Sequence, residues 1–140
     1  MSEHRTVAVI PCSGIGKAFG TVSREAAYEL CDILRPTDTN LVALSKLVLG
    51  EQDAQARVRT NPAITIDGCK LMCASKLVKL SGGTVAREVS VLDVFRRYKD
   101  LKPEGIAELN DPGKELARVI AAEVSASLNE ILADNEGCHA

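Results

Sequence analysis

A chain of 140 residues with 17 basic and 19 acidic side chains has the length of one domain and a formal net charge of −2. Neither sign of charge forms a block, so we expect no nucleic-acid partner and no membrane-surface partner. Hydrophobic residues make up 46% of the chain and aromatic residues 3%, which predicts a core of Val, Leu, Ile and Ala, as in parallel α/β sheets.

The N-terminal sequence and the number of cysteines indicate the cellular compartment in which the protein is expected. The first apolar run, residues 7–10, is too short for the hydrophobic region of a signal peptide, and no stretch has transmembrane length. Five cysteines, an odd number, argue against a disulfide framework in a chain without a secretory signal. We therefore expect a cytoplasmic protein with reduced thiols that serve metal or redox chemistry.

Strands and helices are expected to alternate along the first half of the chain. The apolar periodicity, the glycines and the prolines give the boundaries. The expected elements are a strand at 6–10, a glycine-rich loop at 11–20, a helix from Thr21 that ends at Pro36, a strand at 41–44 and a helix at 51–59.

The alternation continues in the second half. The expected elements are a strand at 63–66, a helix at 70–80, a strand at 84–91, a short helix at 92–98 and a final helix at about 112–133. Asp111 is the expected N-cap of the final helix, because Pro112 suits the first helical position.

This order of elements predicts an α/β fold. Connections too long for hairpins indicate a small, mostly parallel sheet of about four strands with helices on both faces, a Rossmann-like three-layer arrangement. We expect a single domain over residues 1–140, with its core in residues 6–100. Ligands of such sheets bind at the carboxyl ends of the strands.

The stretch with the most chemical content is Asp67-Gly68-Cys69, followed by Cys73. If a helix begins near residue 70, the two thiols lie four residues apart on one helical face. The positive end of the helix dipole then favours thiolates. Asp67, in the turn, can accept from free backbone N–H groups or face a metal. The alternative is that both cysteines are ordinary core residues.

A third thiol is expected at the same edge of the sheet. Cys12 ends the first strand and Cys69 follows the third, so we join Cys12, Cys69 and Cys73 into one site. The fourth ligand position is open to Asp67, water, a partner's residue or a transferred group. Thiolates are preferred ligands of zinc, which makes Zn²⁺ the expected metal.

The same residues carry a resemblance to a known family. Asp67-Gly68-Cys69 with Cys73, preceded near the N-terminus by Cys12-Ser13-Gly14-Ile15-Gly16, resembles the DGC-domain family, whose members are expected to bind zinc. The resemblance runs from about Val7 to about Leu80. It implies a small domain with several chelating cysteines and leaves the biological role unknown.

The remaining candidates are weaker. Cys31 lies about ten residues into the first helix and is expected in the core, and His4 should lie at the opposite edge of the sheet. Cys138-His139 is a ligand-type pair at a chain end. The loop containing Gly14, Gly16 and Gly20 fails the nucleotide-binding and phosphate-binding templates at defined positions.

Two classes of function therefore remain open beside a structural module with buried thiols. The first is a zinc-binding protein whose partners are the metal ion and a protein partner or a second copy of the chain. The second is a redox or sulfur-transfer enzyme that uses Cys69 as nucleophile and Cys73 or Cys12 as the resolving thiol.

Overall fold

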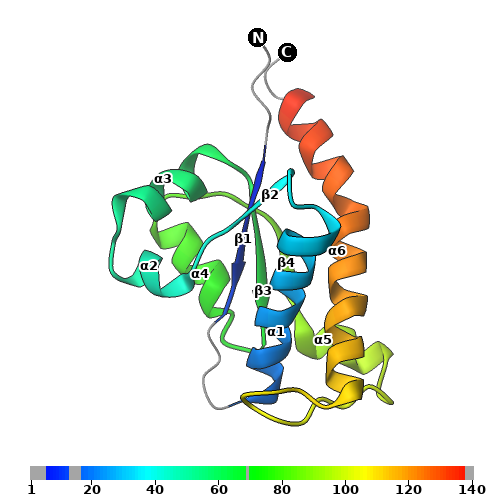
Figure 1. Ribbon diagram of the computed structural model, residues 1–140. Helices are drawn as coiled ribbons and strands as arrows, with labels where there is room; N and C mark the ends of the chain where they lie inside the picture. The colour runs from blue at the N-terminus through cyan, green and yellow to red at the C-terminus, as the bar shows by residue number, and fades with distance from the viewer. Residues whose placement is uncertain (1–5, 13–16, 69, 138–140) are drawn as a thin grey trace.

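The protein is described from a computed structural model that covers residues 6–12, 17–68 and 70–137, without the side chains of residues 134–137. Figure 1 shows the arrangement of its elements. In chain order these are β1 (Val7–Pro11), α1 (Ala18–Tyr28), the π-helix η1 (Glu29–Leu34), β2 (Thr39–Leu41), α2 (Leu44–Val48), α3 (Gln52–Thr60), β3 (Ala63–Asp67), α4 (Cys73–Leu80), β4 (Val85–Ser90), α5 (Val91–Arg97) and α6 (Asp111–Gly137).

The strands form one parallel sheet of four, in the order β2-β1-β3-β4. The register aligns Val9 with Leu41 on one side and with Ile64 on the other. The α/β fold with a small parallel sheet is therefore confirmed. Strands β1 and β3 occupy the centre, and all five side chains of each are buried.

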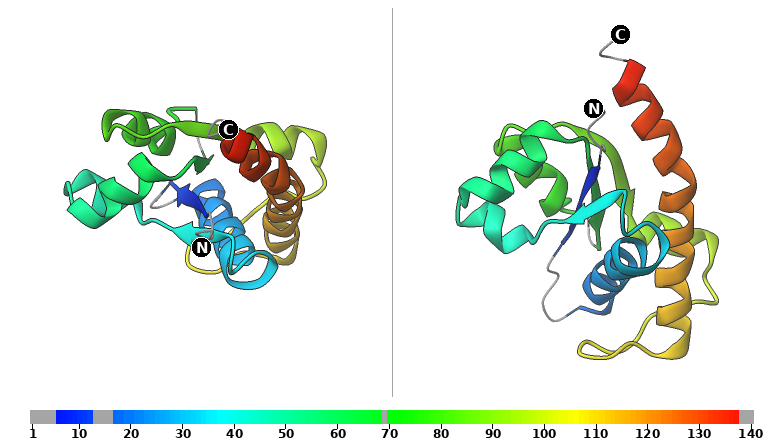
Figure 2. Two further views of the ribbon diagram at one scale, coloured as in Figure 1. Left: turned by 90° about the horizontal axis from the view of Figure 1, so that it is seen from above. Right: turned by 45° about the horizontal axis from the view of Figure 1, so that its top comes forward.

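Alternating side chains of the central strands build two separate cores. Val7 and Val9 pack with α1, η1, α5 and α6, whereas Ala8 and Ile10 pack with α2, α3 and α4. Figures 1 and 2 show these two groups of helices on opposite faces of the sheet. The predicted three-layer arrangement is thus confirmed.

The predictions for the second strand and for the cap of the final helix are wrong. Strand β2 is Thr39–Leu41 instead of 41–44, and Leu44 begins α2. The apolar run continues past the strand because Val42 is buried in the core beneath α2 and α3. The cap of α6 is Asn110 instead of Asp111, since the Asn110 side chain accepts from the Gly113 N–H at 2.9 Å.

Helix α6 covers the core on the α1 side. Its buried residues Leu116, Ile120 and Val124 recur at helical spacing and pack against the same cluster as Val22 of α1. Its exposed residues include Asp111, Glu115 and Arg118. Within the described ranges, no helix combines the length and the apolar character needed for a membrane span.

Cys31 belongs to this core, as predicted. It lies in η1, its side chain is 8% exposed, and a hydrogen bond joins it to Thr39 at the start of β2. Burial raises the pKa of the Cys31 thiol, and the hydrogen bond to Thr39 acts in the opposite direction. The start of β2 is at the amino edge of the sheet, so Cys31 is separated from the carboxyl edge.

Replacing Cys31 tests this separation. We expect Cys31→Ala to lower the free energy of unfolding by about 1 kcal/mol through lost packing, and to leave the thiols at the carboxyl edge unchanged in reactivity. In the wild type, Cys31 should alkylate slowly at neutral pH. Urea unfolding and mass-spectrometric alkylation, read cysteine by cysteine, measure both. Fast alkylation of Cys31 in native protein would contradict its placement.

A second test concerns the contact between α5 and α6. Arg97 binds both carboxylate oxygens of Glu123, at 2.7 and 2.9 Å, and this hydrogen bonding holds the pKa of Glu123 below its ordinary value. A carboxylate whose pKa is lowered by folding stabilises the fold at pH values above its unfolded-state pKa. This stabilisation is lost as the pH falls through the folded-state pKa. Glu123→Gln should therefore be less stable than wild type at pH 7, with a difference that shrinks in acid. Urea titrations across this pH range measure it, and a constant difference would contradict the assignment.

Candidate functional site

Cys12 is held at the carboxyl end of β1 by the neighbouring strand. Its N–H donates to the Ile66 carbonyl at 2.9 Å, which continues the parallel ladder and places Cys12 beside Asp67. The next amide of that ladder, Gly68 N–H, donates to the Cys12 sulfur at 3.1 Å. The hydrogen-bond ladder between β1 and β3 therefore ends at the Cys12 sulfur.

Ser23 of α1 contacts the same cysteine from the other side. Its hydroxyl lies 3.4 Å from the Cys12 sulfur, 3.1 Å from the Cys12 carbonyl oxygen and 2.6 Å from the Gly20 carbonyl oxygen. The side chain is fully buried. Sequence reasoning missed Ser23, because a serine in a helix gives no sign that it faces a thiol 11 residues away.

Gly68 is required by the close approach of β3 to α1. A Cβ atom at this position would lie 2.6 Å from the Phe19 carbonyl oxygen and 2.8 Å from the Gly20 nitrogen. Both are backbone atoms, which cannot move aside as a side chain can. The glycine of the Asp-Gly-Cys motif thus allows the first turn of α1 to pack directly on the end of β3.

Asp67 is buried and binds the start of α4. Its two carboxylate oxygens accept from the N–H groups of Ala74, at 2.9 Å, and Ser75, at 3.3 Å. Burial raises the pKa of Asp67, and these two backbone hydrogen bonds act in the opposite direction. Of the two roles predicted for this carboxylate, binding free backbone N–H groups is the one observed.

The predicted start of the helix is wrong, and the geometry of the two thiols changes with it. Helix α4 begins at Cys73 instead of residue 70, because Met72 has a left-handed backbone with φ 51° and ψ 48°. Residues 70–71 form a turn. The four-residue spacing of Cys69 and Cys73 therefore does not place them on one helical face. Cys73 is exposed, and Cys69 lies outside the described residues.

Hydrogen bonds close the segment between β3 and α4 at both ends. Gly68 binds the Cys12 sulfur at its start, and Ala74, which follows Cys73 directly, binds Asp67 at its end. Cys12, Asp67 and Cys73 are thereby brought to one edge of the sheet. Within residues 6–12, 17–68 and 70–137 there is no group of three or more metal-ligating side chains. The fourth predicted residue, Cys69, falls in a gap between these ranges.

Of the other predicted candidates, one lies toward the amino edge of the sheet and the rest lie in segments of the chain that the structure does not describe. Cys31 is in the core, away from Cys12. His4, Cys138-His139 and the glycines at 14 and 16 lie outside the described residues.

Comparison with known proteins identifies one family. The family model described as the DGC domain matches residues 8–112, which is more than half of the 140-residue chain. No curated protein and no solved structure matches the chain. All the residues of the candidate site lie inside the matched range.

The packing at Gly68 generates a prediction. Gly68→Ala should lower the free energy of unfolding by roughly 1–3 kcal/mol, because the added methyl group meets the α1 backbone. It should also accelerate alkylation of Cys12 by displacing the amide that binds the sulfur. Lys70→Ala, an exposed change in the same segment, is the control and should stay within about 0.5 kcal/mol of wild type. Equal stabilities of the two variants would contradict the close approach.

Proposed function

The chain belongs to the DGC domain family, and on that basis we propose that it is a zinc-binding protein of the reducing cytoplasm. Cys12, Cys69 and Cys73 supply thiolates, and Asp67 is the fourth candidate ligand. The observation that carries the proposal is the closed segment after β3, whose two ends bind the Cys12 sulfur and the Asp67 carboxylate.

The position in the sheet supports a ligand site. In the strand order β2-β1-β3-β4, the chain leaves β1 toward one edge and β3 toward the other, and helices α1 and α4 lie on opposite faces. Open parallel sheets bind ligands at such a switch point, outside the carboxyl ends of the strands. Cys12 follows β1 and the Asp-Gly-Cys segment follows β3, so both strands at the switch point end in candidate ligands.

The donor set suits zinc. Structural zinc sites take four ligands, usually sulfur and nitrogen atoms and sometimes a carboxylate oxygen. Each oxygen of Asp67 accepts one helix amide, and a carboxylate has about four lone-pair sites in total, so the group can still ligate a metal. A bound zinc would connect the end of β1 to the start of α4.

The proposal predicts about one zinc per chain in anaerobically purified protein. Removing a group that hydrogen-bonds to a metal ligand typically lowers the metal affinity ten- to a hundredfold. A larger loss, of more than about a hundredfold, is expected when a ligand itself is removed, as in Cys69→Ser, Cys12→Ser and Cys73→Ser. Elemental analysis and competition with a chromophoric chelator measure occupancy and affinity.

The matched control is Cys31→Ala, which removes a buried thiol at the other edge and should keep full occupancy. Full occupancy in Cys69→Ser and Cys12→Ser would overturn the site. Wild-type protein without zinc, in which Cys69 forms a disulfide with Cys12 or Cys73 on mild oxidation, would favour the thiol enzyme instead.

A further inference from the structure

A cavity of about 360 Å³ opens at the carboxyl end of β2, between that strand and helices α2 and α3. We call it the β2 pocket. Its volume is at the lower end of the range of small-molecule sites, roughly 300–1,000 Å³. Ligands of open parallel sheets bind outside the carboxyl ends of the strands, which is where this cavity lies. The apolar part of its lining is Leu41, Val42, Ala43 and Ala54, of which Val42 and Ala54 are buried.

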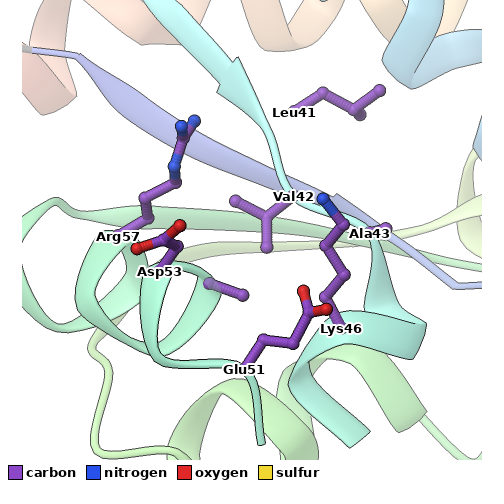
Figure 3. A pocket seen from close by; sticks show the side chains of 8 residues that line it. Leu41, Val42, Ala43, Lys46, Glu51, Asp53 and Arg57 are labelled. Carbon is purple, nitrogen blue, oxygen red and sulfur yellow. The ribbon is translucent and has the colours of Figure 1, made fainter. Parts of the chain in front are cut away.

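Four charged side chains, two of each sign, complete the described lining of the β2 pocket. Lys46 of α2 and Arg57 of α3 are the cations, and Glu51 and Asp53 are the anions. Figure 3 shows Lys46 and Arg57 on opposite sides of Val42, both reaching toward the end of β2. The described lining therefore contains both signs of charge and has no net formal charge.

These four side chains do not neutralise one another. Asp53 and Arg57 are four residues apart on α3, the spacing at which acid–base pairs usually meet on a helix. Among the described residues, however, no ion pair and no side-chain hydrogen bond involves any of the four. Elsewhere in the described chain such pairs do form, as Arg118 does with Glu115 at 3.2 Å. The charges that line the β2 pocket are therefore available to a ligand.

We propose that the β2 pocket binds a free aliphatic α-amino acid. The carboxylate of this ligand binds the two cations, its ammonium group binds the two carboxylates, and its side chain packs against the buried Val42 and Ala54. A ligand with charge of one sign would leave two like charges of the lining facing it, which selects against it. A zwitterion gives each of the four charged groups a partner of opposite sign.

Titration of the purified protein with L-leucine, followed by two-dimensional NMR, tests the proposal. We expect saturable binding, with shifts concentrated on the residues that line the β2 pocket. Two analogues of similar size test the charges separately, because isocaproate lacks the ammonium group and L-leucinamide lacks the carboxylate. Each analogue should bind about tenfold or more weakly than L-leucine, the size expected when a charge-assisted hydrogen bond is lost.

Two variants separate the two halves of the ligand. Arg57→Gln and Asp53→Asn change exposed side chains, so they should keep the fold, and each should weaken L-leucine binding by about tenfold. Their effects on isocaproate should be opposite, because Arg57→Gln removes a partner of its carboxylate and Asp53→Asn removes a repelling charge. Lys76→Gln is the matched control and should change neither affinity, since it removes an exposed cation of α4 that lies outside the described lining.

Several results would overturn the proposal: no saturable binding of L-leucine, equal affinities for L-leucine and isocaproate, or unchanged L-leucine affinity in both variants. Shifts confined to the residues around Cys12 and Cys73 would also overturn it, since they would place the amino acid at the candidate zinc site. The described lining of the β2 pocket contains no candidate zinc ligand, so this result stands apart from the zinc measurement.

Discussion

The hydrogen bond from Gly68 N–H to the Cys12 sulfur, 3.1 Å long, joins the two central strands at the edge where the candidate site lies. It forms because the end of β3 packs directly on the first turn of α1, where a side chain at position 68 would meet the Phe19 carbonyl. That packing also brings Ser23 within reach of Cys12. The position of the thiol thus depends on a glycine that follows another strand and on a serine in a helix.

The buried Asp67 constrains the segment that follows. A carboxylate without solvent needs donors, and the amides at the start of α4 supply two of them. Those amides follow directly after Met72, whose backbone is left-handed. The energetic demand of one buried carboxylate therefore sets where α4 begins and places Cys73 in its first turn.

Two features of the carboxyl edge involve the same residue, Cys12. Cys12 is a candidate metal ligand and also lines a cavity of about 380 Å³ together with Leu41 and Leu44. The family match ends at residue 112, the second residue of α6, so it contains every residue of the site, while α6 covers the core behind α1. The candidate site and helix α6, which covers the core, thus lie in separate parts of the sequence.

The sequence by itself determined the parallel α/β sheet, the burial of Cys31 and the placement of Cys12 and Asp67 at one edge, because β-branched runs, turn residues and helical periodicity are local signals. Tertiary structure decided the rest. Gly68 and Cys12 are 56 residues apart, and no local pattern shows that one binds the other. The start of α4 likewise follows from the burial of Asp67, which overrides the helical preference of residues 70–72. The cavity lined by the ends of β1 and β2 and by α1 exists only once those segments pack together.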